Sequence, residues 1–499
     1  MTDQAEMKNE QDEPEPGPPR MVRRFRFAPG RPPAVSSRAM VATSQPLATW
    51  AGLRALECGG NAADAALAAA AVLTVVEPMS TGIGGDCFAL VWRDGRIDAL
   101  DAAGPAPASA TNLDDVAQRG PRSVTVPGSV AGWAALSERH GRLGLDRCLA
   151  PAIDLAERGF AVAPVTAALW TAAGAPEELL PSPAAGQRVA MGPLAATLHR
   201  IAVEGPSGFY HGPVAEAIAA ASWLEESDLA AFEPRWVEPL RLNYRGTEVI
   251  ELPAPTQGVA ALEGLGLLER TDPSLASQVH CARLALEDAL EHVRDGVDVR
   301  HLLDAEYLDE RVGDVPRPIV EPPAGTVYLC VVDEDRMAVS FIQSIYMSFG
   351  SRVMAPGTGV ILQNRGAGFS VQGRIVPGAR PYHTIIPGML MRDGALWGAF
   401  GVMGGPIQAQ AHMQLVSGLV DEGLDPQAAL DRPRFLVAPE GVRLEEGLWP
   451  QAAQLEERGE RIVRDDNHPT FGGGQAILVD GDALVGGSDA RKDGYAGGF

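Results

Sequence analysis

Lysine is nearly absent from this chain of 499 residues: of its 41 basic side chains only two, Lys8 and Lys492, are lysine. Neither follows a glycine-rich loop, which excludes a phosphate-binding P-loop. Acidic side chains number 64, and the net charge is −23. Such a surface repels nucleic acids and anionic membranes. We therefore expect a small-molecule substrate, no nucleic-acid partner and no membrane association.

Cysteine and histidine are also scarce and show no ligand spacing. The nine histidines include no HExxH motif, and the five cysteines include no CxxC motif, which argues against a metal site and against a disulfide framework. The sequence also lacks the GxGxxG and GxSxG motifs of dinucleotide-binding folds and of serine hydrolases. We therefore expect neither a metal nor a cofactor. The cysteines are Cys58, Cys87, Cys148, Cys281 and Cys330.

Long hydrophobic runs are missing as well. The longest apolar helical stretch, Ala65 to Val76, is shorter than the ~20 residues that span a bilayer. The N-terminus is acidic and then arginine-rich, and no apolar segment of a signal peptide follows. These features predict a disordered tail over residues 1–37 and a cytoplasmic protein.

The remaining sequence alternates between helical and strand patterns. Gln45–Glu57 has a helical apolar face, and Asn61 is a suitable N-cap for an alanine-rich helix that ends at Val76. After Thr326, runs of strand character recur and a helix over Gln408–Glu422 interrupts them. Strand pairs flanked by helices predict a layered α/β or α+β architecture.

A Gly-Thr pair ends the proline-bearing linker and opens the apolar run VYLCVV. Gly325 and Thr326 have two interpretations. In the first, glycine marks a turn and threonine begins a strand. In the second, the chain is cut between them and Thr326 becomes an N-terminal nucleophile. A threonine hydroxyl needs a base to attack an amide, and a free α-amine with a pKa of ~7.7–8.0 supplies that base on the same residue.

Three glycine clusters follow strand-like segments, and they also have two interpretations. They are Gly82–Gly85, Gly404–Gly405 and Gly472–Gly474. Glycine doublets are common in plain turns, but their exposed N–H groups can also face a ligand and hold a developing oxyanion.

Several longer motifs, read together, resemble the γ-glutamyltranspeptidase family of N-terminal-nucleophile hydrolases. The resemblance covers residues 38–499 and includes AMVATSQPLATWAGLRALECGGNAADAALAAAAVLTVVEPMSTGIGGDCFALVW, GTVYLCVVDEDRMAVSFIQSIYMSFGS, GVILQNRGAGFS, ARPYHTIIPGML and FGGGQAI. It implies an α+β fold of four αββα layers. It also implies self-cleavage into a large chain, 38–325, and a small chain, 326–499. The two fragments remain associated as a heterodimer, and a higher oligomer is left open.

The resemblance also assigns roles to individual residues. Thr326 corresponds to the nucleophile, and Ser344 stands where the family has a threonine that orients it. Gly404 and Gly405 match the pair whose amides form the oxyanion hole, and Thr384 matches the second residue of a serine pair in the substrate pocket.

The departures from the family pattern concern the substrate. Ala103 replaces the arginine that holds the α-carboxylate of a glutamyl group, and Arg365 and Gly368 replace the groups that hold its ammonium. Tyr346 replaces an asparagine and His383 replaces the first pocket serine. Arg365 offers a fork for a carboxylate, with a structural ion pair as the alternative.

These observations predict an amidohydrolase or acyltransferase that acts on a small carboxylate-bearing amide through an acyl-enzyme. Two alternatives stay open. One is a true γ-glutamyltransferase or glutathione hydrolase. The other is an unprocessed, inactive relative that acts as a binding or scaffold protein.

Overall fold

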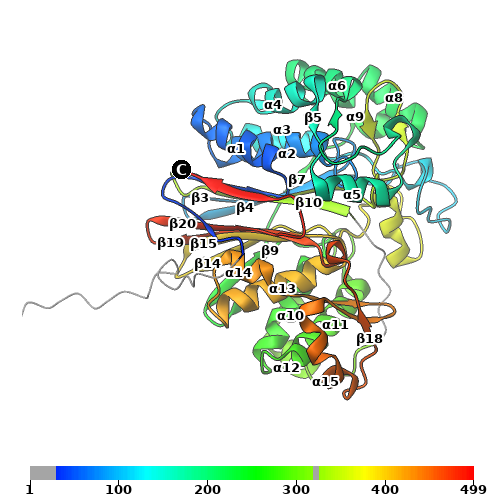
Figure 1. The fold of residues 1–499 in the computed structure, drawn as a ribbon. Coiled ribbons are helices and arrows are strands. Elements are labelled where there is room, and N and C mark those ends of the chain that lie inside the picture. The colour runs from blue at the N-terminus through cyan, green and yellow to red at the C-terminus, as the bar shows by residue number, and fades with distance from the viewer. Residues whose placement is uncertain (1–29, 318–324) are drawn as a thin grey trace, which may run out of the picture.

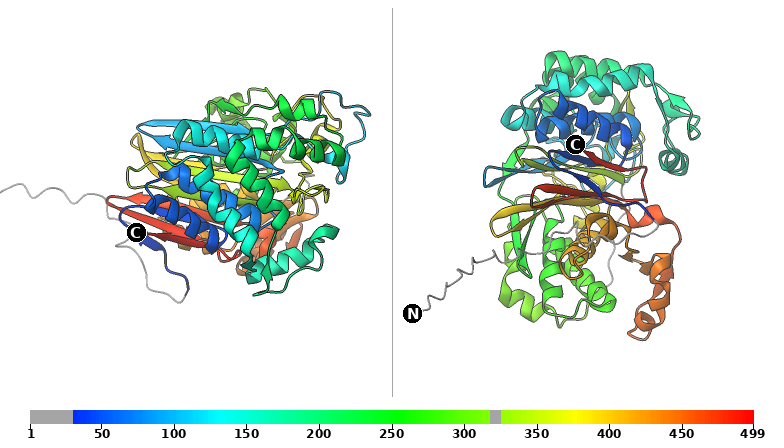
Figure 2. Two further views of the ribbon diagram at one scale, coloured as in Figure 1. Left: turned by 90° about the horizontal axis from the view of Figure 1, so that it is seen from above. Right: turned by 60° about the vertical axis from the view of Figure 1, so that its left-hand side comes forward.

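The computed structural model describes residues 30–317 and 325–499. Within these residues, two seven-stranded sheets lie face to face, and helices cover the outer side of each sheet (Figures 1 and 2). This arrangement confirms the predicted α+β fold of four αββα layers.

The first sheet contains the strand that begins with the Gly-Thr pair. All neighbouring strands in it are antiparallel. Their order is β21 (Tyr495–Gly498), β2 (Met40–Thr43), β10 (Gly325–Val332), β11 (Ala338–Tyr346), β3 (Asp86–Arg93), β4 (Arg96–Ala102) and β7 (Arg235–Val237).

In the second sheet, too, all neighbouring strands are antiparallel. Its order is β1 (Ala34–Ser36), β20 (Ala483–Ser488), β19 (Gly473–Asp480), β15 (Ala395–Met403), β14 (Gly388–Arg392), β9 (Thr247–Glu251) and β8 (Leu240–Tyr244). Both sheets therefore combine strands from before and after residue 325.

Helices from the first half of the chain gather on the side of the first sheet, at the top of Figure 1. They are α1 (Pro46–Glu57), α2 (Ala62–Val76), α3 (Ser129–His140), α4 (Leu145–Arg158), α5 (Pro164–Ala173), α6 (Gly192–Glu204), α7 (Ser207–Tyr210), α8 (Pro213–Ala221) and α9 (Glu226–Ala230).

A second group of helices covers the other sheet. It comprises α10 (Gly258–Glu269), α11 (Leu275–His292), α12 (Ala305–Arg311), α13 (Ile407–Val420), α14 (Pro426–Asp431) and α15 (Ala452–Glu456). Short strands complete the fold: β5 (Phe160–Ala161) with β6 (Arg188–Val189), β12 (Met354–Ala355) with β13 (Val360–Ile361), and β16 (Phe435–Ala438), β17 (Gly441–Leu444) and β18 (Ile462–Arg464) together.

Strand β10 is buried on both faces, which explains its continuous apolar sequence. Val327, Leu329 and Val331 belong to the core between the first sheet and α2, whereas Tyr328 and Cys330 belong to the core between the two sheets. This period-two alternation places even-numbered residues of β10 on the side of the second sheet.

Helix α2 begins where the sequence predicts. The Asn61 side chain accepts hydrogen bonds from the backbone N–H groups of Ala63 and Asp64, and the Asp64 carboxylate accepts one from the Asn61 N–H. This capping box satisfies N–H groups that the helix itself leaves free. None of the described helices is long and apolar enough to cross a membrane.

The folded part begins earlier than predicted. Strand β1 pairs with β20 through Ala34, Val35 and Ser36, residues that the sequence analysis assigned to a tail ending at residue 37. A strand of three residues at a sheet edge is too short to show a periodic pattern, so its pairing becomes visible only in three dimensions. Residues 1–29 of that predicted tail lie outside the described residues.

Candidate active site

Thr326 lies near the start of β10, between β2 and β11 in the middle of the first sheet. Its hydroxyl donates a hydrogen bond to the carbonyl oxygen of Gly325 at 2.6 Å. The pairing of β10 with β11 shifts register between Gly325 and Val327, so Thr326 occupies an irregular position in the ladder. The predicted nucleophile thus contacts the carbonyl group of the predicted cleavage site, and its side chain is only 2% exposed.

Ser344, on β11, lies beside both groups. Its hydroxyl donates to the Gly325 carbonyl oxygen at 2.6 Å and accepts from the backbone N–H of Tyr346 at 2.8 Å. The oxygens of Ser344 and Thr326 are 3.3 Å apart. Two hydroxyls and one carbonyl therefore share a hydrogen-bond network at this point of the chain.

Arg365 reaches the same network from the short 3-10 helix Arg365–Gln372. Its guanidinium carbon lies 4.2 Å from the centre of the Tyr346 ring, and its Nη2 donates to the Ser344 hydroxyl at 3.3 Å. Arg365 is completely buried, and its Nε and Nη1 find no hydrogen-bond partner among the residues that the structure describes. The side chain thus keeps unused donors beside Ser344.

Burial has an electrostatic consequence for Arg365. Desolvation lowers its pKa to about 10, although the Tyr346 hydroxyl and the Asp86 carboxylate oppose this shift. The guanidinium stays positive at neutral pH. Because a buried charge is costly unless it is paired and hydrogen-bonded, this cation with free N–H groups is suited to hold an anion such as a carboxylate.

Asp86, the first residue of β3, was not singled out by the sequence analysis. Its Oδ1 accepts hydrogen bonds from the N–H groups of Gly104 and Gly128 and from the Gln363 side chain, at 3.1, 3.1 and 2.9 Å. Its Oδ2 lies 3.0 Å from Nε2 of His383. One buried carboxylate therefore connects four segments near Arg365.

His383 uses both ring nitrogens within the protein. Nδ1 lies 2.6 Å from the carbonyl oxygen of Pro381, which can only accept, so Nδ1 carries a hydrogen. Burial and the neighbouring Arg365 lower the pKa of His383, whereas hydrogen bonds to Asp86 and Pro381 oppose the shift. His383 thus lies next to the charged groups of the site, with Nδ1 bonded to Pro381 and Nε2 facing Asp86.

Thr384 follows His383 and is also buried. Its backbone oxygen accepts a hydrogen bond from the Gln257 side chain at 2.7 Å. Its hydroxyl oxygen has no hydrogen-bond partner within the described part of the chain. This leaves one further polar group without a protein partner beside His383.

Gly404 and Gly405 connect β15 to α13. Their φ angles are +127° and +71°, a region that favours glycine. A Cβ atom on Gly404 would lie 2.8 Å from Cα of Gly472 and from Cγ2 of Ile407. The predicted oxyanion-hole glycines therefore form a turn that other residues would strain, and the third glycine cluster packs directly against it.

Gln408, in the first turn of α13, was also missed by the sequence analysis as a site residue. It is wholly buried, and its Nε2 donates to the Thr326 hydroxyl at 3.4 Å. This contact brings the glycine turn and the start of β10 to one place. Its only sequence signal is its position three residues after Gly405.

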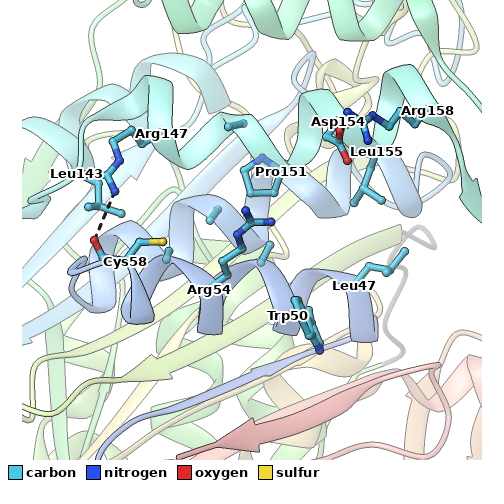
Figure 3. Close-up of a pocket in the computed structure, with 14 residues that line it drawn as sticks. Leu47, Trp50, Arg54, Cys58, Leu143, Arg147, Pro151, Asp154, Leu155 and Arg158 are labelled. Atoms are coloured by element: carbon cyan, nitrogen blue, oxygen red, sulfur yellow. Dashed lines mark hydrogen bonds and ion pairs between the residues drawn. The ribbon is translucent and has the colours of Figure 1, made fainter.

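One groove lies away from these residues. It has a volume of about 680 Å³ and opens between α1 and α4, with Trp50 and Leu47 on one side and Pro151 and Leu155 on the other (Figure 3). None of the predicted site residues lines it. The described residues contain no group of three or more His, Cys, Asp or Glu side chains arranged to hold a metal ion.

Comparisons with known proteins agree with this geometry. The family model described as gamma-glutamyltranspeptidase matches residues 48–499. A glutathione hydrolase-like YwrD proenzyme of Bacillus subtilis is 33% identical, over 93% of this chain and 99% of that protein. An oxamate amidohydrolase proenzyme of Klebsiella pneumoniae is 34% identical over the same shares. The crystal structure of a cephalosporin acylase from Bacillus halodurans superimposes with a TM-score of 0.88 at 38% identity, covering 95% of this chain and 98% of that one.

Proposed function

The chain belongs to the gamma-glutamyltranspeptidase family of N-terminal-nucleophile hydrolases, and on that premise we propose that it matures by cutting itself between Gly325 and Thr326. The mature enzyme would be a heterodimer of a large chain ending at Gly325 and a small chain starting at Thr326. Relatives named as proenzymes support processing of this kind.

Self-cleavage needs an attack by the Thr326 hydroxyl on the carbonyl carbon of Gly325. The C–Oγ bond forms, the C–N bond of the peptide breaks, and the threonine nitrogen takes the proton that the hydroxyl loses. Water then hydrolyses the resulting ester and leaves a carboxylate on Gly325. The hydrogen bond from Ser344 to the Gly325 oxygen supports this step, because it withdraws charge from the oxygen on which negative charge develops.

In the mature enzyme the freed amine of Thr326 serves as the base. With a pKa of ~7.7–8.0, an α-amine accepts the hydroxyl proton near neutral pH. The Thr326 oxygen attacks the amide carbonyl of the substrate, and the amine returns the proton to the leaving nitrogen. The N–H groups of Gly404 and Gly405 are proposed to hold the oxyanion, and water or an amine then resolves the acyl-enzyme.

We propose that the substrate is a small amide with a carboxylate group, and this proposal depends on Arg365. Its Nε and Nη1 have no hydrogen-bond partner among the described residues, which supports an anionic group on the substrate. Tyr346 supports the guanidinium through its ring, and His383 and Thr384 complete the proposed pocket wall. The guanidinium reaches Ser344 at 3.3 Å, and Ser344 in turn lies 3.3 Å from the nucleophile. A carboxylate bound here would therefore be separated from the scissile carbonyl by only a short spacer.

The names of some relatives support such a substrate class. Oxamate amidohydrolase and acylase are the names of three similar proteins, whereas glutathione hydrolase is the name of others. Ala103 and Arg365 remove the charges that would hold a glutamyl head group, so glutathione hydrolysis is the weaker candidate. Each lost charge-assisted hydrogen bond corresponds to about 1.5–3 kcal/mol of binding.

The experiment combines processing with substrate preference. We expect wild-type protein to run as two bands on a denaturing gel, near two-thirds and one-third of the mass, and Thr326→Ala to run as one. The processed enzyme should hydrolyse short amides with a free carboxylate faster than their methyl esters and faster than a γ-glutamyl anilide. A single full-length band for the wild type would support the scaffold alternative, and efficient turnover of the γ-glutamyl compound would overturn the substrate class.

A further inference from the structure

Gln408 is held in one orientation by the backbone around it. Its Oε1 lies 3.2 Å from the N–H of Ile386, which can only donate, so the amide oxygen faces Ile386. The amide nitrogen therefore faces the Thr326 hydroxyl, at 3.4 Å. The backbone N–H of Gln408 bonds to the carbonyl of Gly405 at 3.1 Å, so the glycine turn fixes the start of this helix as well.

The next turn of α13 anchors the same face of the helix. His412, four residues on, lies on the same side as Gln408. Its Nε2 accepts a hydrogen bond from the Val402 N–H at 3.0 Å, and its Nδ1 donates to Glu251 at 2.6 Å. Both residues are fully buried. Because α13 is tied to β15 and β9 in this way, Gln408 has little freedom to move away from Thr326.

We propose that Gln408 is a catalytic hydrogen-bond donor to the reacting oxygen of Thr326, acting chiefly when the acyl-enzyme is hydrolysed. This inference rests on the proposed role of Thr326 as nucleophile. In the acyl-enzyme, the threonine oxygen is the ester oxygen. When water attacks, the α-amine takes a proton from the water, the C–Oγ bond breaks and the electron pair stays on Oγ, which then takes that proton from the α-ammonium group. An N–H aimed at Oγ stabilises the charge that appears there as it leaves.

A purely structural role for Gln408 makes different predictions. In that case its amide only satisfies the Ile386 N–H, and loss of the side chain lowers stability without slowing one step of the reaction. Gln410 is the matched control, since it is a buried glutamine on the same helix. Its amide bonds to Pro406 and to both backbone groups of Val437, and no hydrogen bond is recorded between it and Thr326.

The test compares Gln408→Met, Gln408→Glu and Gln410→Ala in the full chain. We expect Gln408→Met to lower kcat about 10- to 100-fold, with KM falling in parallel, because removal of one donor to a developing charge has effects of this order. Mass spectrometry of the quenched reaction with the preferred short amide should then show the small chain as its acyl adduct. Gln410→Ala should lower thermal stability and leave kcat within about twofold of wild type.

The glutamate variant adds a pH signature that a structural role does not produce. A protonated carboxyl can donate to Oγ and an ionised one cannot. The ratio of kcat for Gln408→Glu to kcat for wild type should therefore fall as the pH rises. If this ratio is flat and Gln408→Met keeps wild-type kcat, the inference is wrong. A Gln408→Met variant that folds but does not cleave itself supports the inference, because the Thr326 oxygen also performs the self-cleavage. If Gln408→Met does not fold, the pH dependence of kcat for Gln408→Glu decides.

Failure of the inference differs from failure of the proposed function. If wild-type protein is uncut, or if Thr326→Ala retains activity, the nucleophile assignment itself is wrong. If the wild type is cut and active while both Gln408 variants behave like wild type, only the role of Gln408 is refuted.

Discussion

Replacing Arg365 by methionine should make the protein more stable and at the same time a poorer enzyme. Arg365 is fully buried, and burial lowers its pKa to about 10. This shift corresponds to a free energy of unfolding that is lower by about 3 kcal/mol at neutral pH. Methionine fills the space of the arginine side chain from Cβ to Nε and carries no charge. The variant loses the stacking of the guanidinium on Tyr346 and its hydrogen bond to Ser344, which together contribute about 1–2 kcal/mol. The net gain is about 1–2 kcal/mol, which in a chain of this size raises Tm by about 1–3 °C.

The effect on substrate binding has the opposite sign. Two charge-assisted hydrogen bonds from Nε and Nη1 to a carboxylate are worth about 3 kcal/mol together, so KM for the short carboxylate-bearing amide should rise about 100-fold. The methyl ester of the same amide should be turned over equally by both proteins. Calorimetric unfolding and steady-state kinetics on matched preparations measure the two quantities.

Arg434 is the control, because it is also buried but both of its terminal nitrogens are hydrogen-bonded. It donates to the Phe471 and Leu430 carbonyls and to Asp489, at 2.9, 3.1 and 2.7 Å. Arg434→Met leaves the buried Asp489 carboxylate with Arg491 as its remaining cation and should destabilise the fold by about 1–3 kcal/mol without changing KM. If Arg365→Met behaves like Arg434→Met, with lower stability and unchanged KM, Arg365 is a structural residue and the substrate proposal loses its basis.

Three further predictions concern single groups. Ser344→Ala should slow self-cleavage about 10-fold or more, because it removes the hydroxyl donor to Gly325, and a time course on a denaturing gel measures the rate; cleavage at the wild-type rate would refute this role. Gly404→Ala should lower both kcat and Tm, since its φ of +127° and the 2.8 Å approach to Gly472 leave no room for a Cβ; a variant with normal activity would show that the turn is not part of the site. Burial raises the pKa of Glu77 to about 7, so the folded state favours its protonated form and this contribution to stability is lost as the pH rises from about 4.5 to 7. Glu77→Gln should therefore have a higher Tm than wild type at pH 8, and the difference should vanish by pH 5.

Local signals predicted the elements around the site. The cap at Asn61 and the apolar run of β10 are properties of short segments, and both are found where the sequence indicates them. Helix α10 carries no such signal, because Gly264 and Gly266 weaken its helical pattern. The structure explains these glycines: a Cβ at Gly264 would lie 3.1 Å from Met413, and one at Gly266 would lie 2.8 Å from Leu308. They permit close helix packing, which only the tertiary structure reveals.

The same limit applies to the site. A resemblance identifies the positions that form a family's site even where the residues differ, and Thr326, Ser344 and Arg365 do lie together in the structure. Asp86 and Gln408 lie 240 residues before and 82 residues after Thr326 and contact the site through folding alone. No periodic pattern marks them, because each acts through a hydrogen bond to a residue distant in sequence.

The order of strands has a consequence for the two fragments. β10 and β11 follow the proposed cut and lie between β2 and β3, which precede it, while the other sheet places β1 beside β20 and β9 beside β14. A cut after the first residue of β10 therefore breaks the covalent chain but leaves the strand pairing of both sheets in place, and each sheet contains strands from both fragments. Their association should not depend on protein concentration, and they should part only in the transition that melts both sheets.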